Sequence, residues 1–123
     1  MRNAAELYKM EQLRGMVEGK SPKELLLLTF SKIIDNLKKI DDAIEHSKLE
    51  TKHTLVNKTH DIITVGLMAS LNKQVNEQLV NSLLNFYSES IKRLTYINLS
   101  NNRELLARLS IDFTELKHCF EKC

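Results

Sequence analysis

The chain has 123 residues, of which 42% are hydrophobic, with three Gly, one Pro, no Trp and a formal net charge of +2 at pH 7. This length suits one domain with its own core, and the small net charge argues against a dedicated nucleic-acid binder, which carries clustered Lys and Arg. No apolar run approaches the roughly 18 residues of a membrane span, and no apolar leader follows Arg2. We therefore expect a cytoplasmic protein with reduced cysteines and no membrane insertion. The scarcity of helix breakers predicts an all-α fold.

Residues 1–20 are predicted to form a short N-terminal helical arm. Apolar residues recur in it at spacings of three and four, as expected for one face of a helix, and Gly15 and Gly19 weaken its far end. The residues of this face are Leu7, Met10, Leu13 and Val17, with Tyr8 beside them. Because an isolated helix this short is marginal in water, we expect the arm to dock as a mobile cover over a groove that binds a partner.

The first long helix is predicted at about residues 21–47. Ser21 is a preferred N-cap, Pro22 fits the first helical position, and Glu24 completes a capping box with Ser21. Its apolar stripe repeats with steps of four and three, the spacing of a helical bundle. The stripe is Leu26, Phe30, Ile33, Leu37, Ile40 and Ile44.

Three further long helices are predicted at about 48–72, 75–99 and 101–121. A second capping box at Ser47 to Glu50 begins the first of them, and Asn101 with Glu104 caps the last. In the helix at 75–99, Leu83, Phe86, Ser90 and Leu94 carry the stripe, with Tyr87 to one side. Ile111 falls off the stripe of the last helix. Gly66 inside a helix suggests a close approach of a neighbouring helix. Short connections imply an antiparallel up-down four-helix bundle.

Candidate chemistry is sparse. A di-iron bundle needs a Glu-x-x-His string on each of two helices, and the chain has two such strings, Glu50 to His53 and Glu115 to His118. In this topology they lie roughly 20 Å apart along the bundle, and both histidines lie off the apolar stripes. The histidines at 46, 53 and 60 are two turns apart, too far for one ion. We expect no catalytic residue, no cofactor and no bound metal.

The two cysteines, Cys119 and Cys123, would lie on one helical face near the end of the chain. Without a matching Cys or His elsewhere in the sequence, they amount to no more than half of a zinc site.

Surplus apolar residues lie beside the predicted seams of the bundle. Two interpretations remain open: broad stripes that simply build the core, or grooves that bind another apolar helix. The second interpretation, together with the arm, predicts a partner-binding set made of Tyr8, Met10, Leu13, Val17, Leu25, Leu27, Ile34, Leu84 and Tyr87.

An ordered set of short motifs resembles one bacterial family. The set is Val17-x-x-x-Ser21-Pro22, Glu24-Leu25-Leu26, Ala43-Ile44, Lys52, Lys58, Asp61-Ile62-Ile63, Leu67, Leu71, Leu83, Phe86-Tyr87, Arg93-Leu94 and Asn98-Leu99. Its order and spacing, from about residue 12 to 120, resemble the flagellin-specific export chaperones of the FliS family. The chain departs from the family pattern at Gln12, where Tyr is usual, at Thr29-Phe30, where Leu-Tyr is usual, and near Phe120, where a Trp is usual.

The resemblance implies a non-catalytic chaperone. Members of this family hold the C-terminal segment of newly made flagellin in the cytosol, prevent its early polymerisation and deliver it to the flagellar type III export apparatus. Other flagellar export components are possible partners, as is a second copy of the chain. The alternative is a helical-bundle adaptor or self-associating module for another amphipathic helical partner.

Overall fold

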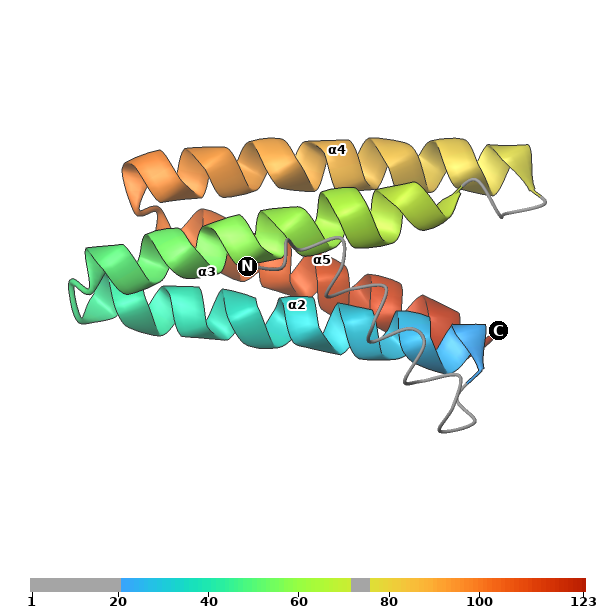
Figure 1. Cartoon of the computed structure of the whole chain (residues 1–123), viewed down its shortest axis with the longest axis horizontal. Helices are drawn as coiled ribbons and strands as arrows, with labels where there is room; N and C mark the ends of the chain where they lie inside the picture. Colours follow the sequence, from blue (N-terminus) through green and yellow to red (C-terminus); the bar gives the residue numbers. More distant parts are fainter. Residues whose placement is uncertain (1–20, 72–75) are drawn as a thin grey trace, which may run out of the picture.

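The computed structural model describes residues 21–71 and 76–123, which are helical almost throughout (Figure 1). The predicted arm, residues 1–20, lies outside the described residues. The helical elements are α2 (Pro22–Glu45), α3 (Leu49–Asp61), the π-helix η1 (Ile62–Met68), α4 (Glu77–Ser100) and α5 (Arg103–Glu121). No strand occurs among these described residues, and the prediction of an all-α helical bundle is confirmed.

The helices surround a single apolar core. α2 packs against α3 and α5, and α4 packs against α3, η1 and α5. In Figure 1 each of the long helices runs antiparallel to the one that precedes it in the sequence. The buried apolar residues come from all of the long helices and form one cluster: Phe30, Ile33, Leu37, Ile40, Val56, Ile63, Leu67, Leu71, Leu83, Tyr87, Leu94, Ile97, Leu106, Leu109 and Phe113.

The first helix begins where the sequence predicts. Ser21 is the N-cap of α2, with extended backbone, and its Oγ accepts a 3.1 Å hydrogen bond from the backbone N–H of Glu24. Pro22 occupies the first helical position, where no backbone N–H is needed. The predicted start at Ser21 is therefore confirmed.

The caps at the two other predicted sites are different. Ser47 has φ 55° and ends α2, with Lys48 N–H donating to Ala43 O at 2.8 Å and Ser47 N–H donating to Ile44 O at 3.1 Å. These bonds form a Schellman C-cap, and α3 starts without a side-chain cap. The predicted capping box at Ser47 is wrong, because the last turn of α2 already holds its backbone.

The cap of the last helix is displaced by one residue. Asn101 has φ 57° and ends α4, whereas Asn102 accepts a 3.0 Å hydrogen bond from Leu105 N–H as the N-cap of α5. Asn tolerates the left-handed conformation better than most residues, so the first Asn of the pair closes one helix and the second opens the next.

The π-helix η1 was not predicted, and its position follows from the core. Ile63, Leu67 and Leu71 are all buried at steps of four. Two α-helical turns hold about 7.2 residues, so a straight α-helix would leave Leu71 roughly 80° away from Ile63. A π turn takes up about one more residue, because its hydrogen bonds span five residues instead of four. The π-helix thus returns Leu71 to the core, with Gly66 buried in the same segment.

Candidate docking groove

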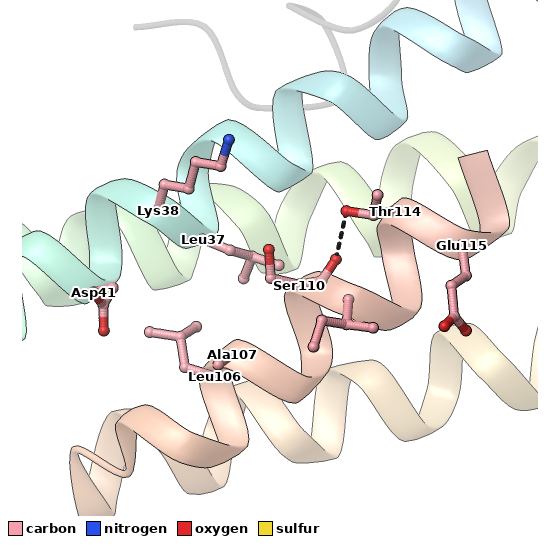
Figure 2. A pocket seen from close by; sticks show the side chains of 9 residues that line it. Leu37, Lys38, Asp41, Leu106, Ala107, Ser110, Thr114 and Glu115 are labelled. Carbon is pink, nitrogen blue, oxygen red and sulfur yellow. Dashed lines mark hydrogen bonds between the residues drawn. The ribbon is translucent and has the colours of Figure 1, made fainter. Parts of the chain in front are cut away.

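A groove of about 420 Å³ lies between α2 and α5 (Figure 2). Figure 2 shows the side chains of Leu37 and Leu106 between the two helices. Both are buried and form the floor. The residues lining the groove are Leu37, Lys38 and Asp41 from α2, and Leu106, Ala107, Ser110, Ile111, Thr114 and Glu115 from α5.

The groove is an apolar trough with charged edges. Ile111 is 50% exposed although it is a large apolar residue. Lys38 and Glu115 are exposed, and Asp41 is half-buried. The Thr114 hydroxyl donates to Ser110 O at 2.8 Å, so it does not need a hydrogen bond from an occupant. A floor of this kind with polar edges suits the apolar face of an amphipathic helix.

An ion pair closes one end of the seam between α2 and α5. Arg103 donates to both carboxylate oxygens of Asp41, at 2.8 and 3.0 Å, and lies 3.7 Å from Glu45. The hydrogen bond from Arg103 lowers the pKa of Asp41 below its ordinary value, and the positive charge of Arg103 adds to this, outweighing partial burial, which acts in the opposite direction. The same hydrogen bond raises the pKa of Arg103.

At the other end of the seam, the Lys23 ammonium donates to Cys123 O at 2.7 Å. The start of α2 is therefore tied to the residues that follow α5. Polar contacts thus hold the two helices together at both ends, while the apolar groove lies between these contacts.

Two of the predicted partner-binding residues continue the groove along α2. Ile34 is seven residues before Asp41, and Leu27 is seven residues before Ile34, so all three lie near one edge of the helix. Asp41 faces α5 through Arg103. Leu27 and Ile34 are half-buried against the core, and they extend the apolar edge toward the start of α2.

Leu25 and Leu84 lie on other edges of the bundle. Leu25 is half-buried on α2, two residues before Leu27 and therefore on a different side of the helix. Leu84 is 40% exposed on α4. Arg93 of α4 donates a 2.8 Å hydrogen bond to Asp112 of α5, so this edge of α4 faces α5. Leu84 lies two and a half turns before Arg93 and is therefore on the opposite edge of α4. The structure does not bring these two residues to the groove.

Tyr87 requires a correction. The sequence placed it beside the seam with Phe86 on the stripe, but Tyr87 is 1% exposed and belongs to the core. Phe86 instead contacts Phe113 of α5, with ring centroids 5.0 Å apart. The buried stripe of α4 runs through Leu83, Tyr87 and Ser90 at the helical steps of four and three, and Phe86 lies half-buried beside it. The Tyr87 side chain is not part of the surface in this structure.

The remaining four predicted residues belong to the arm, and the α5 side of the groove was not predicted. Tyr8, Met10, Leu13 and Val17 lie outside the described residues. The α5 side of the groove was missed, although one signal was present: Ile111 falls off the apolar stripe of its helix.

The Glu-x-x-His strings do not converge in the bundle. Glu50, His53, Glu115 and His118 are all exposed. Within residues 21–71 and 76–123, the one group of three possible metal ligands is Asp42, Glu45 and His46, which is exposed. His46 Nδ1 lies 2.9 Å from Asp42 O and 3.2 Å from Asp42 Oδ1, so the nitrogen is engaged within its own helix turn.

Among the described helices, none combines the length and apolar character needed to cross a membrane.

Comparison with known proteins gives the family. A family model described as "Flagellar protein FliS" matches residues 3–123.

The chain belongs to the FliS family. It is 27% identical over 114 residues to the flagellar secretion chaperone FliSB of Pseudomonas aeruginosa, a match that covers 93% of this chain and 90% of that protein. It is 24% identical over 97 residues to the flagellar secretion chaperone FliS of Escherichia coli K12, covering 79% of this chain and 71% of that protein. The FliS family resemblance predicted from the short motifs is therefore confirmed.

Proposed function

We propose that this chain is a cytoplasmic secretion chaperone without catalytic activity. It binds the C-terminal segment of flagellin, keeps that segment from polymerising early and delivers it to the flagellar type III export apparatus. The observation that carries the proposal is the family match over residues 3–123. The names of the two relatives, both flagellar secretion chaperones, support it.

The groove between α2 and α5 supplies a binding surface for such a client. Leu27, Ile34 and Ile111 offer apolar surface beside a floor that is already formed. An unfolded amphipathic segment gains a helical template there, and burial of its apolar face offsets part of the entropy lost on ordering. Lys38 and Glu115 at the edges give the groove both signs of charge, which helps to orient the segment.

The direct test is calorimetric titration of the chain with a peptide from the flagellin C-terminus. We expect saturable binding with a negative change in heat capacity, the mark of buried apolar surface. Ile111→Glu should weaken this binding at least tenfold, because it removes apolar area and places a charge in the groove.

Leu99→Glu is the matched control, since Leu99 is 81% exposed on α4 and is not a lining residue of the groove. It should leave the affinity unchanged. Failure of the wild-type chain to bind the peptide would refute the proposed function. Equal loss in both variants would refute the assignment of this groove.

A further inference from the structure

The two cysteines form an exposed pair on the last turn of the bundle. Cys119 and Cys123 are the two cysteines of the chain, and both are free and exposed. Free cysteine is among the most buried residue types in proteins. Two exposed thiols within one helical turn are therefore unusual, and neither thiol contributes to the core.

The backbone turns Cys123, two residues beyond the end of α5, back toward Cys119 in the last helical turn. The helical conformation extends through Lys122, with φ −84° and ψ −9°, and Cys123 N–H donates to Phe120 O at 3.3 Å. Side chains four residues apart on a helix have Cβ atoms about 5–6 Å apart. The Sγ of Cys123 lies 3.3 Å from Cys119 O, so this side chain already points back toward Cys119.

This spacing suits two ligands of one thiophilic ion. Tetrahedral zinc binds cysteine sulfur at about 2.3 Å, which places two ligand sulfurs about 3.8 Å apart. Both side chains are exposed, so each can rotate about its Cα–Cβ bond. Such rotation can bring the two sulfurs to this distance although the Cβ atoms stay farther apart. The ammonium of Lys23 near Cys123 O supplies positive charge beside a site that would carry excess negative charge.

The pair supplies only half of the ligands. Zinc in structural sites takes four, whereas the group of three possible ligands within the described part of the chain lies elsewhere, at Asp42, Glu45 and His46. Figure 1 shows that the end of α5 lies at one end of the bundle, beside the start of α2, so the cysteine pair is not enclosed by the described helices. Two identical half-sites related by a twofold axis complete a tetrahedral site.

We propose that Cys119 and Cys123 of two copies of this chain bind one zinc ion and join the bundles at their C-terminal ends. The sequence expectation of no bound metal rested on the Glu-x-x-His strings and on the lack of a matching Cys or His within one chain. A second copy supplies the missing pair. The site is independent of the client groove, whose lining on α5 ends at Glu115.

The test uses the full chain without a tag, reduced and freed of metal, and titrates it with Co²⁺ as a spectroscopic substitute for zinc. We expect a thiolate-to-cobalt charge-transfer band together with visible bands of tetrahedral cobalt. These should saturate at one ion for each pair of chains, while sedimentation shows a dimer. Added Zn²⁺ should bleach the bands and preserve the dimer.

The double variant Cys119→Ser, Cys123→Ser is the control, and circular dichroism checks that it remains helical. It should show no cobalt bands and stay monomeric. Saturation at one ion per chain without a change of mass would overturn the proposal. So would bands equal to those of the double variant, or a dimer that persists in chelator and reductant.

Discussion

The ammonium of Lys52 donates a 2.6 Å hydrogen bond to Asn101 Oδ1, joining the second turn of α3 to the residue that ends α4. It also donates to Asn98 O at 2.8 Å. Lys52 is only 3% exposed. The negative end of the α4 dipole and an otherwise unpaired carbonyl of its last turn thus stabilise a buried cation. A charged side chain here holds two helices in register.

Replacement of Lys52 by Met should therefore destabilise the bundle. Met keeps much of the side-chain length but removes the charged donor of two hydrogen bonds, to Asn98 O and Asn101 Oδ1, a loss of about 1–3 kcal/mol. Urea denaturation followed by circular dichroism measures it. Lys58→Met on the exposed side of the same helix is the control and should change the free energy of unfolding by less than about 0.5 kcal/mol. Equal effects of both substitutions would contradict the assigned role of Lys52.

The cap at Ser21 gives a second prediction. Ser21→Ala removes the acceptor of the Glu24 N–H and should lower the free energy of unfolding by about 1 kcal/mol. Ser31→Ala, in the interior of the same helix, should be neutral or slightly stabilising, because Ala has the higher helix propensity. An unchanged denaturation midpoint for Ser21→Ala would show that the cap adds no stability.

The pair of Asp41 and Arg103 predicts a dependence of stability on pH. Because the folded-state pKa of Asp41 is lowered, its stabilising contribution is complete above the unfolded pKa of about 3.9 and is lost as the pH falls through the lower folded value. Asp41→Asn should thus be less stable than wild type at pH 7, and this difference should shrink at acid pH.

The magnitude of the Asp41 effect at pH 7 should stay below about 1 kcal/mol, since both partners are partly exposed and screened by solvent. Denaturation curves at pH 7 and at about pH 3 measure the difference. Asp35→Asn, which breaks only an exposed pair with Lys39, is the control at pH 7 and should change the free energy of unfolding less than Asp41→Asn does. A difference for Asp41→Asn that grows at acid pH would have the wrong sign.

The arm remains a prediction from the sequence. If residues 1–20 cover the groove about nine-tenths of the time, the chain binds a client about tenfold more weakly than its open form. Deletion of residues 1–19, which keeps the Ser21 cap, should then tighten binding of the flagellin peptide by up to about tenfold. Titration of both proteins measures this effect. Weaker binding by the shortened, still helical chain would place the arm within the binding surface, and equal binding would place the groove elsewhere.

Local signals predicted most of the fold, and their failures have physical causes. Ser21 and Ser47 each begin a Ser-x-x-Glu string, yet only Ser21 is an N-cap. Pro22 confines Ser21 to the start of a helix, whereas the Schellman bonds at the end of α2 hold Ser47 in a left-handed conformation. Such competition between two adjacent helix ends cannot be read from either string by itself.

The groove was predictable on one side only. Ile34 and Leu27 follow from their spacing on one helix. Ile111 could be seen as an apolar residue off its stripe, but its role depends on which helix lies beside it, and the stripe of one helix does not give this. The prediction placed Phe86 on the stripe and Tyr87 beside it, whereas the structure has the reverse. This error also reflects a neighbouring helix that the sequence of α4 does not reveal, because the Phe113 ring that contacts Phe86 belongs to α5.

The π-helix η1 allows the chain to hold one extra residue without moving the next apolar side chain out of the core. From Ile63 to Leu71 the sequence holds one residue more than two α-helical turns need, and the wider turn absorbs that residue before the core is reached again. A relative that lacks one residue in this interval could form a plain α-helix and still present the same apolar face. A single-residue gap here is therefore a change that the bundle can accommodate without repacking, whereas the same gap in the middle of α2 would turn Ile40 away from its neighbours.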